Sequence, residues 1–432
     1  MLSYCIFLFA WLFPPGLYTG YVREPDLMFL DPSTFIFYTS CVMAFLLGVR
    51  TNRFLGNEAR TKSVVGISVH TPFLYLCVPV LLGTVCCCIY LKLLGGKINL
   101  LGLLAAQDGN AIKMAGQVGQ LETGRWSSSL LMLTAILWWA SFRAKQLRLK
   151  GAAKNTFRIL FLLGVLVDTA TCVATVDRTN LMPLIAGLAV VFLFSRASSE
   201  NVKLYKITLF GLGSMAVVVA FFFAIAVLRG DAALRLLIMG FLGYTIVSYN
   251  RMAALLLGVM HDSYEGRGAF LFPFLRAGYF DSLFHLSNRF NWPSSFSVWL
   301  SAFGSVSSAG LNPAFNFYST FGDLYSDLGW LALVYLFVLG VSVGYLWSRF
   351  RAGKTFALVL YPWCAFWILF WPGFNILFDV RALEITKMAL ALVVYDQLRI
   401  RYVRETAETE ATTASGLSLF EPAATGLEGR LL

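Results

Sequence analysis

The sequence predicts an all-α, polytopic membrane protein with about ten transmembrane helices, in a range of ten to twelve, and one large loop on the outer face. Of its 432 residues, 58% are hydrophobic and only 13% are charged, and the mean hydropathy is +0.71. Ordinary globular chains are about 25% charged. Apolar segments near the ~20 residues that cross a bilayer recur along the chain, and basic residues concentrate in alternate loops.

The apolar segments predict the helices in order. The first, 2–21, lacks a basic n-region and a small-residue cleavage site, so we interpret it as a retained membrane helix and not as a signal peptide. The other predicted helices are 34–49, 71–94, 127–142, 159–176, 181–195, 207–228, 329–347, 356–375 and 382–398. Residues 1–404 then form one membrane domain, and the Thr- and Ala-rich tail 405–432 is expected to be a disordered cytoplasmic tail.

The charges of the loops predict the orientation. Five short loops contain 19 of the 34 Lys and Arg residues: 50–62, 143–158, 196–206, 349–354 and 399–404. All five fall on one side of a ten-helix count, and the positive-inside rule assigns that side to the cytoplasm. Both termini are then expected in the cytoplasm. The net charge of +11 is explained by this distribution and does not require a nucleic-acid partner.

The opposite side carries the large predicted loop, residues 229–328, which we expect to face the periplasm. Its apolar stretch 236–260 is interrupted by Asn250 and Arg251. Since an arginine in the middle of a bilayer is costly, we expect helices here that lie at the outer surface or dip into it. The loop continues with further charged side chains, among them His261, Arg276, His285 and Arg289.

The aromatic residues of this loop allow two interpretations. Tyr279, Trp292, Phe296 and Trp299 could stack on sugar rings, or they could anchor the loop at the membrane interface. The eight cysteines are less informative, since nearly all lie in apolar segments and behave there as small hydrophobic residues. No Cys or His spacing typical of a metal site or a disulfide framework occurs, so we expect neither a metal nor a cofactor.

One predicted helix begins at the outer face with an arginine. In "TVDRTNLMPLIAGL", Arg178 precedes Thr179 and Asn180 at the start of the helix. The amino end of a helix favours anions, and the planar donor fork of arginine fits phosphate. Alternatively, Asp177 caps the helix and Arg178 reaches to lipid head groups.

Another helix begins with paired acids and tyrosines. In "NFYSTFGDLYSDLGWLAL", Asp323 and Asp327 are four residues apart, and Tyr318 and Tyr325 are seven apart. These spacings place each pair on one helical face. One of the acids could deprotonate a hydroxyl group of a substrate.

The same stretch has more ordinary interpretations. Asn316 or Ser319 could cap the helix, while the acids compensate its positive end or pair with an arginine of the loop. His261 and His285 are alternative bases, although a loop histidine is more often solvated.

Three stretches together resemble the Wzy-type polymerases that join lipid-linked O-antigen or capsule repeat units. In the order of that family, they are "DRTNLMPLIAGL", "GRGAFLFPFL" in the large loop, and "NFYSTFGDLYSDLGWLA". The resemblance covers roughly residues 160 to 350. The chain departs from the family at Asp177, where a small residue is common, at Leu328, where Phe is common, and at Ala332, where a second Gly is common.

The resemblance implies a metal-independent, inverting glycosyltransferase on the periplasmic face of a bacterial inner membrane. It would polymerise repeat units carried on undecaprenyl pyrophosphate, for O-antigen, capsule or exopolysaccharide. The implied partners are these lipid-linked glycans, membrane lipids, a flippase and a chain-length regulator. The implied catalytic residues are Arg178, Asp323, Asp327 and His261, and the implied substrate-binding residues are Arg251, Arg276, Arg289, Asn316, Tyr318 and Tyr325.

Two other functions stay open at this stage. An O-antigen ligase, which transfers glycan to lipid A–core, is poorly separated from a polymerase by sequence alone. A non-enzymatic flippase or transporter of lipid-linked sugars is the second alternative. A transporter is expected to show two related halves with broken helices at mid-membrane, and the sequence contains no such halves.

Overall fold

The computed structural model describes residues 2–24, 27–54, 66–97, 124–147, 149–174, 178–196, 234–243 and 245–403, with the single residues Gly213, Ala220 and Phe223. Almost all of these residues are helical. Two short strands, β1 (Gly66–Val69) and β2 (Ile400–Val403), pair antiparallel with Val69 opposite Ile400. The predicted helix 207–228 and the predicted tail 405–432 lie outside the described residues, apart from Gly213, Ala220 and Phe223.

The α-helices occupy the following ranges: α1 (Leu2–Leu12), α2 (Pro15–Val22), α3 (Pro32–Phe54), α4 (Pro72–Lys97), α7 (Ser129–Leu147), α8 (Gly151–Ala174), α9 (Arg178–Arg196), α11 (Leu234–Gly243), α12 (Ile246–Leu256), α13 (Gly278–Phe284), α14 (Leu286–Phe290), α15 (Ser295–Ser308), α16 (Ser319–Leu328), α17 (Ala332–Arg351), α18 (Thr355–Leu369) and α19 (Val380–Arg399). Short 3₁₀-helices are η1 (Met28–Leu30), η3 (Gly124–Ser128), η4 (Pro273–Arg276) and η5 (Gly329–Leu331).

The helical class is confirmed, but the predicted count of about ten membrane spans is not. Within the described residues, four segments are long and apolar enough to cross a membrane: Pro32–Asn52, Pro72–Leu94, Gly151–Ala174 and Ser319–Arg351. A bent pair of helices, Tyr4–Leu12 with Pro15–Val22, raises this number to five if it is one broken span. The described part of the protein is therefore helical, with four or five candidate membrane spans.

The first predicted helix, 2–21, is not a single straight helix. It divides into α1 and α2, which are bent by 98°. The break falls at Pro14 and Pro15, where proline removes a helical hydrogen bond and constrains the residue before it. With 11 residues, α1 rises about 16 Å, roughly half of the ~30 Å hydrocarbon core of a bilayer.

Helix α7 is a predicted span that is not among these four segments. It matches the predicted helix 127–142 and buries a continuous set of side chains that includes Trp138 and Trp139. It packs against α4, α9 and α19. A high hydropathy here reflects burial against other helices, and sequence periodicity does not distinguish this from contact with lipid.

Helices α3 and α17 pack unusually closely through three glycines. A Cβ atom at Gly340 would lie 2.2 Å from the carbonyl oxygen of Phe45, and one at Gly48 would lie 2.1 Å from that of Phe337. Gly344 faces the backbone of α3 in the same way, one turn further on. This is the small-residue packing by which membrane helices approach each other.

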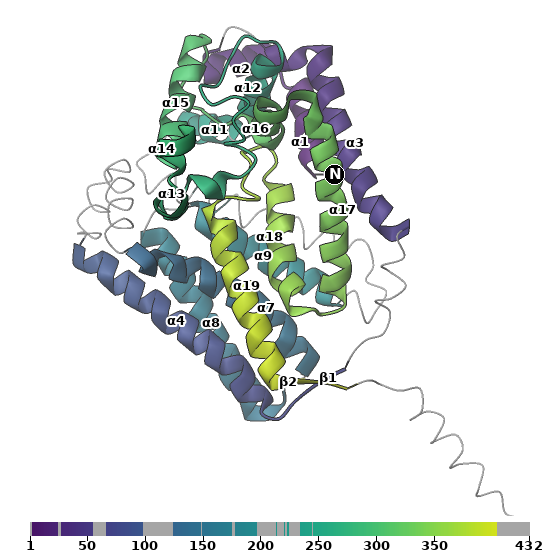
Figure 1. Cartoon of the computed structure of the whole chain (residues 1–432), viewed down its shortest axis with the longest axis vertical. Helices are drawn as coiled ribbons and strands as arrows, with labels where there is room; N and C mark the ends of the chain where they lie inside the picture. Colours follow the sequence, from purple (N-terminus) through teal and green to yellow (C-terminus); the bar gives the residue numbers. More distant parts are fainter. Residues whose placement is uncertain are drawn as a thin grey trace, which may run out of the picture.

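The predicted clustering of the basic loops on one side agrees with the packing of the helix ends. Arg143, near the end of α7, donates hydrogen bonds to Thr355 at the start of α18 and to Asp396 near the end of α19, both at 2.7 Å. Lys145 reaches the carbonyl of Phe192 near the end of α9. The helix ends connected by these contacts border four of the five basic loops. After α19, β2 pairs with β1 at the same end of the molecule (Figure 1).

The other end of the molecule contains α2, α11, α12, α15 and α16 (Figure 1). Most of the predicted outer loop therefore folds into a helical layer. Within the stretch 236–260, every residue from Ile246 to Leu255 of α12 is buried, whereas Leu257 and Val259 after the helix are exposed. Helix α12 packs against α1, α3 and α16. The free-energy cost of burying Arg251 is offset by its hydrogen bonds and its ion pair with Glu24.

Candidate functional site

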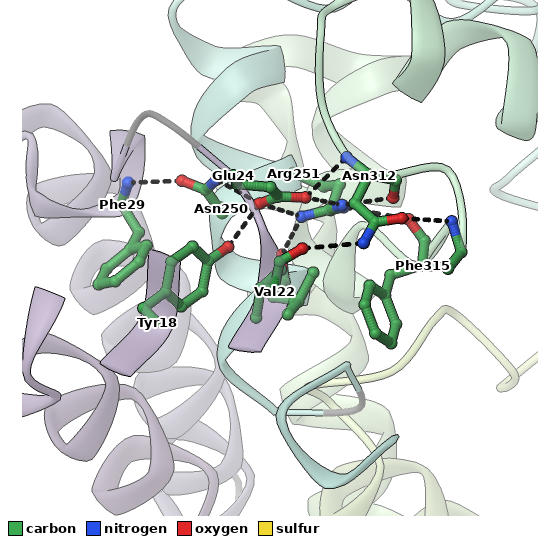
Figure 2. Close-up of polar contacts among 10 residues, drawn as sticks. Tyr18, Val22, Glu24, Phe29, Asn250, Arg251, Asn312 and Phe315 are labelled. Atoms are coloured by element: carbon green, nitrogen blue, oxygen red, sulfur yellow. Dashed lines mark hydrogen bonds and ion pairs between the residues drawn. The ribbon is translucent and has the colours of Figure 1, made fainter. Parts of the chain in front are cut away.

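The polar cluster around Arg251 is closed (Figure 2). The two terminal nitrogens of Arg251 contact both carboxylate oxygens of Glu24, with Nη1 to Oε2 at 2.8 Å. They also donate to the carbonyls of Val247 and Asn312, at 3.4 and 2.9 Å. Nε donates to the carbonyl of Phe315 at 3.1 Å. All five N–H groups of the guanidinium therefore have protein acceptors.

Both carboxylate oxygens of Glu24 also accept hydrogen bonds from several protein donors. Besides Arg251, Glu24 accepts hydrogen bonds from the Tyr18 hydroxyl at 2.6 Å, the Asn250 amide at 3.0 Å and the Asn312 backbone N–H at 2.9 Å. Burial alone would raise the pKa of Glu24, but the hydrogen bonds and the charge of Arg251 outweigh burial, and the pKa is lowered. The pair is ionised at neutral pH and holds α2, α12 and the 312–315 loop together.

Arg251, expected from the sequence to be a possible pyrophosphate ligand, thus has no donor left for a phosphate group. Its side chain is fully buried. We assign it a role in the scaffold. The sequence did not point to Glu24, because a single acid between α2 and α3 carries no local pattern.

A second polar cluster forms where three segments meet: 262–276, 318–327 and 371–381. We call it the carboxylate junction. Asp327 on α16 accepts three backbone hydrogen bonds from one loop, from the N–H groups of Gly268 at 3.0 Å, Phe270 at 2.7 Å and Leu271 at 2.9 Å. Gly266 donates to the Ser326 carbonyl at 3.0 Å. Two of the stretches that carry the family resemblance are therefore joined through Asp327.

Asp323 lies one turn before Asp327 and faces the same region, as the spacing of four predicts. The fully buried carboxylate accepts the backbone N–H of Asn375 at 2.6 Å. The side-chain amide of Asn375 donates to the Phe270 carbonyl at 3.0 Å. Thr320 adds two further bonds between α16 and the 371–381 segment. Asn375 therefore links all three segments, and the sequence analysis did not identify it.

Arg276 ends η4 and faces this group of acids. Its Nε is buried without a hydrogen-bond partner, and its guanidinium makes no hydrogen bond or ion pair with any residue that the structure describes. The ring of Phe270 lies 5.9 Å away. Burial lowers the pKa of Arg276, and four carboxylates oppose this shift: Asp323, Asp379, Asp327 and Asp262. An arginine keeps its charge at neutral pH in such surroundings. The N–H groups of Arg276 are therefore charged donors that make no hydrogen bond to a described residue.

Asp262 extends the junction toward Tyr318. The Tyr318 hydroxyl donates to Asp262 at 3.2 Å, and the backbone N–H of Tyr264 donates to the other carboxylate oxygen at 2.9 Å. Burial raises the pKa of Asp262 despite these bonds. The neighbouring His261, an alternative base in the sequence, is exposed, and its Nδ1 lies 3.6 Å from the carboxylate of Glu265.

Two tyrosines expected on one face are separated by the fold. Tyr318 precedes α16, because Ser319 adopts a positive φ of 65°. Tyr325 packs edge-on against Phe37 of α3, with ring centroids 5.2 Å apart. As one alternative predicted, Ser319 caps the helix, accepting the N–H of Gly322 at 3.2 Å.

The remaining predicted residues do not enter the junction. Arg289 is exposed on α14. The Asn316 side chain makes no hydrogen bond to a described residue and is half-buried. Arg178 begins α9, as the sequence pattern predicts, but its side chain lies outside the described part of the structure, and so do Val176 and Asp177 before it.

Asp379 and Arg381 complete the junction. Asp379 caps α19 by accepting the N–H of Ala382 at 3.1 Å and also accepts from Arg381 at 2.6 Å. Among the described residues, no group of three or more His, Cys, Asp or Glu side chains could hold a metal ion. A comparison with known protein families, curated proteins and solved structures gives no significant match to this chain.

The side chains of the junction suit a ligand that carries both an anion and hydroxyl groups. The free guanidinium of Arg276 offers donors to an anionic oxygen. The carboxylates of Asp262 and Asp323 offer acceptors to hydroxyl groups. A sugar phosphate combines the two features.

Proposed function

We propose that the protein is a membrane glycosyltransferase that polymerises undecaprenyl-pyrophosphate-linked oligosaccharide repeat units on the outer face of the bacterial inner membrane. The observation that carries the proposal is Arg276, a charged guanidinium with no bound acceptor, beside buried carboxylates. The resemblance of "GRGAFLFPFL" and "NFYSTFGDLYSDLGWLA" to the Wzy-type polymerases supports it, since these stretches form two sides of the same junction.

In this proposal, Arg276 donates hydrogen bonds to the pyrophosphate of the donor lipid. Negative charge on that group grows as the bond from the anomeric carbon to oxygen breaks, so a fixed cation stabilises the transition state more than the bound substrate. The acceptor hydroxyl attacks the anomeric carbon and gives its proton to a carboxylate.

Asp323 is the better placed base of the acid pair. Only one of its oxygens is occupied by a hydrogen bond to a described residue, from Asn375. Asp327 is held by three N–H groups and is better suited to shaping the loop. Arg178, at the start of α9, remains a second residue proposed to bind the pyrophosphate of the donor lipid.

The test is a strain that lacks the protein and receives it back as wild type, Arg276→Ala or Arg276→Lys, with protein levels measured. We expect long glycan chains with the wild type and single repeat units with Arg276→Ala. The lysine variant should also be impaired if the contact is bidentate. Full-length polymer in both variants would remove Arg276 from the mechanism.

The same assay separates the alternatives. Polymer that forms on the carrier lipid but fails to reach lipid A–core in the deletion strain would identify a ligase. Lipid-linked repeat units that accumulate on the cytoplasmic side would identify a flippase. Either result would overturn the polymerase proposal.

A further inference from the structure

A patch of exposed apolar side chains covers three consecutive helices, α13, α14 and α15. We call it the α13–α15 patch. Tyr279, Phe290 and Phe296 are the most open, with 66%, 69% and 67% of their surface exposed. The patch consists of Tyr279, Leu283, Phe284, Phe290, Phe296, Trp299 and Leu300. Such a run of large apolar side chains is unusual on a surface that faces only water.

Helix α15 shows that this patch is not simply the buried side of an amphipathic helix. Its core-facing side chains are Val298, Ala302 and Val306, which are all buried. Trp299 and Leu300 point elsewhere and stay exposed. The helix therefore has two apolar faces, of which one packs on the protein and the other has no described partner. A soluble surface helix would be polar on that side.

The charged side chains of this segment are Asp281 and Arg289, and Arg289 is exposed on α14. The carboxylate of Asp281 is occupied by the N–H and hydroxyl groups of Ser287, at 2.7 and 2.8 Å. Exposed aromatic and aliphatic side chains with basic residues beside them are typical of helices that lie in the interface of a bilayer with anionic lipids.

The patch lies on a side of the molecule that already has an apolar surface. In Figure 1, α13, α14 and α15 lie on the same side of the view as the C-terminal end of α4, one of the candidate spans. Helix α4 exposes a row of apolar side chains that includes Leu82, Ile89 and Leu93.

From these observations we propose that the α13–α15 patch docks in the interfacial region of the lipid bilayer, with its apolar side chains among the acyl-chain ends and Arg289 against anionic head groups. This inference does not depend on the proposed enzymatic function. It assigns the segment 278–300 to the membrane surface, where it borders the carboxylate junction through η4. A lipid-linked substrate would then reach Arg276 along a surface that stays in contact with lipid.

The first experiment places single cysteines in the full-length protein, in a background without native cysteines. Leu283→Cys and Phe290→Cys lie in the patch, and Ser263→Cys is an exposed control outside it. Each is labelled with an environment-sensitive fluorophore and reconstituted in nanodiscs of phosphatidylcholine, with or without phosphatidylglycerol. We expect spin-labelled lipid to quench the two patch sites several-fold more than the control.

Three outcomes would overturn the proposal. Quenching by aqueous iodide but not by lipid at both patch sites would show a water-exposed surface. Shielding from both quenchers would show that protein or glycan covers the patch. Equal quenching with and without phosphatidylglycerol, unchanged by Arg289→Gln, would remove the anionic head groups from the proposal.

A second measurement needs no substitution. The wild-type protein is reconstituted with photoactivatable phosphatidylcholine, and the cross-linked peptides are identified by mass spectrometry. We expect cross-links within 278–300 as well as on α4 and α8. Cross-links on α4 and α8 with none in 278–300 would contradict the proposal even if the labelled variants misfold.

Discussion

Arg251 and Arg276 belong to the same predicted loop, and Arg251 is fully buried while Arg276 has a buried Nε, yet the two differ in the use of their N–H donors. Arg251 uses all five donors on protein acceptors. Arg276 uses none on the described residues, although four carboxylates lie near it. A buried charge is stable only when it is paired and hydrogen-bonded. The contrast teaches that donor satisfaction, rather than burial, distinguishes a scaffold arginine from a candidate binding arginine.

The largest expected effect comes from breaking the closed cluster. Arg251→Ala leaves Glu24 buried without its cation, and removing one partner of a buried pair costs about 3–5 kcal/mol of stability. We expect a strongly lowered Tm of the detergent-purified protein and poor expression. The double variant Glu24→Gln/Arg251→Met should be more stable than Arg251→Ala alone. A wild-type Tm for Arg251→Ala would end the scaffold interpretation.

The second effect should appear in activity and not in stability. Arg276→Ala removes a guanidinium that makes no hydrogen bond to a described residue, so the Tm of the variant should stay near that of the wild type. If Arg276 binds the leaving pyrophosphate, kcat should fall by about 10²–10³, the usual cost of one such donor. Thermal unfolding and chain-length gels on the same preparations measure both quantities. A large loss of Tm with normal specific activity would reverse the comparison.

A smaller effect should separate the two acids of α16. Asp327→Asn replaces one acceptor oxygen by an amide group and leaves at least one buried N–H of the 268–271 loop unpaired, at a cost of about 1–3 kcal/mol. Asp323→Asn can keep its one bond to Asn375 through the amide oxygen, so it should cost less stability. As the proposed base, it should lose more activity per folded molecule. Identical Tm and activity in both variants would contradict this division of roles.

The smallest expected effect is the dependence of the wild-type Tm on pH. The folded-state pKa of Glu24 is lowered by Arg251, so the pair contributes stability above the unfolded pKa of about 4.3. That contribution is lost as the pH falls from there through the folded pKa. In Glu24→Gln, the Tm should be lower at neutral pH and should change less on acidification than in the wild type. Parallel Tm curves for both proteins would show that Glu24 is not ionised in the fold.

Local patterns were enough to predict several features. The apolar segments of about 20 residues predict a helical membrane protein, because a helix of that length crosses a bilayer with its backbone hydrogen bonds satisfied within itself. The loop charges predict which helix ends lie together, as the contacts of Arg143 and Lys145 confirm. The spacing of Asp323 and Asp327 predicts a shared face, because residues four apart are neighbours on a helix.

Only the tertiary structure decided the number of candidate spans and the partners of the charged residues. Hydropathy reports that α7 is apolar but not that helices, rather than lipid, surround it. Glu24 and Arg251 are 227 positions apart, and Asn375 reaches Asp323 across 52. No periodicity encodes such pairs, since they depend on how whole helices pack. For the same reason, sequence patterns do not distinguish Arg251 from Arg276, whereas the fold makes Arg251 part of the scaffold and leaves Arg276 without a hydrogen bond to any residue that the structure describes.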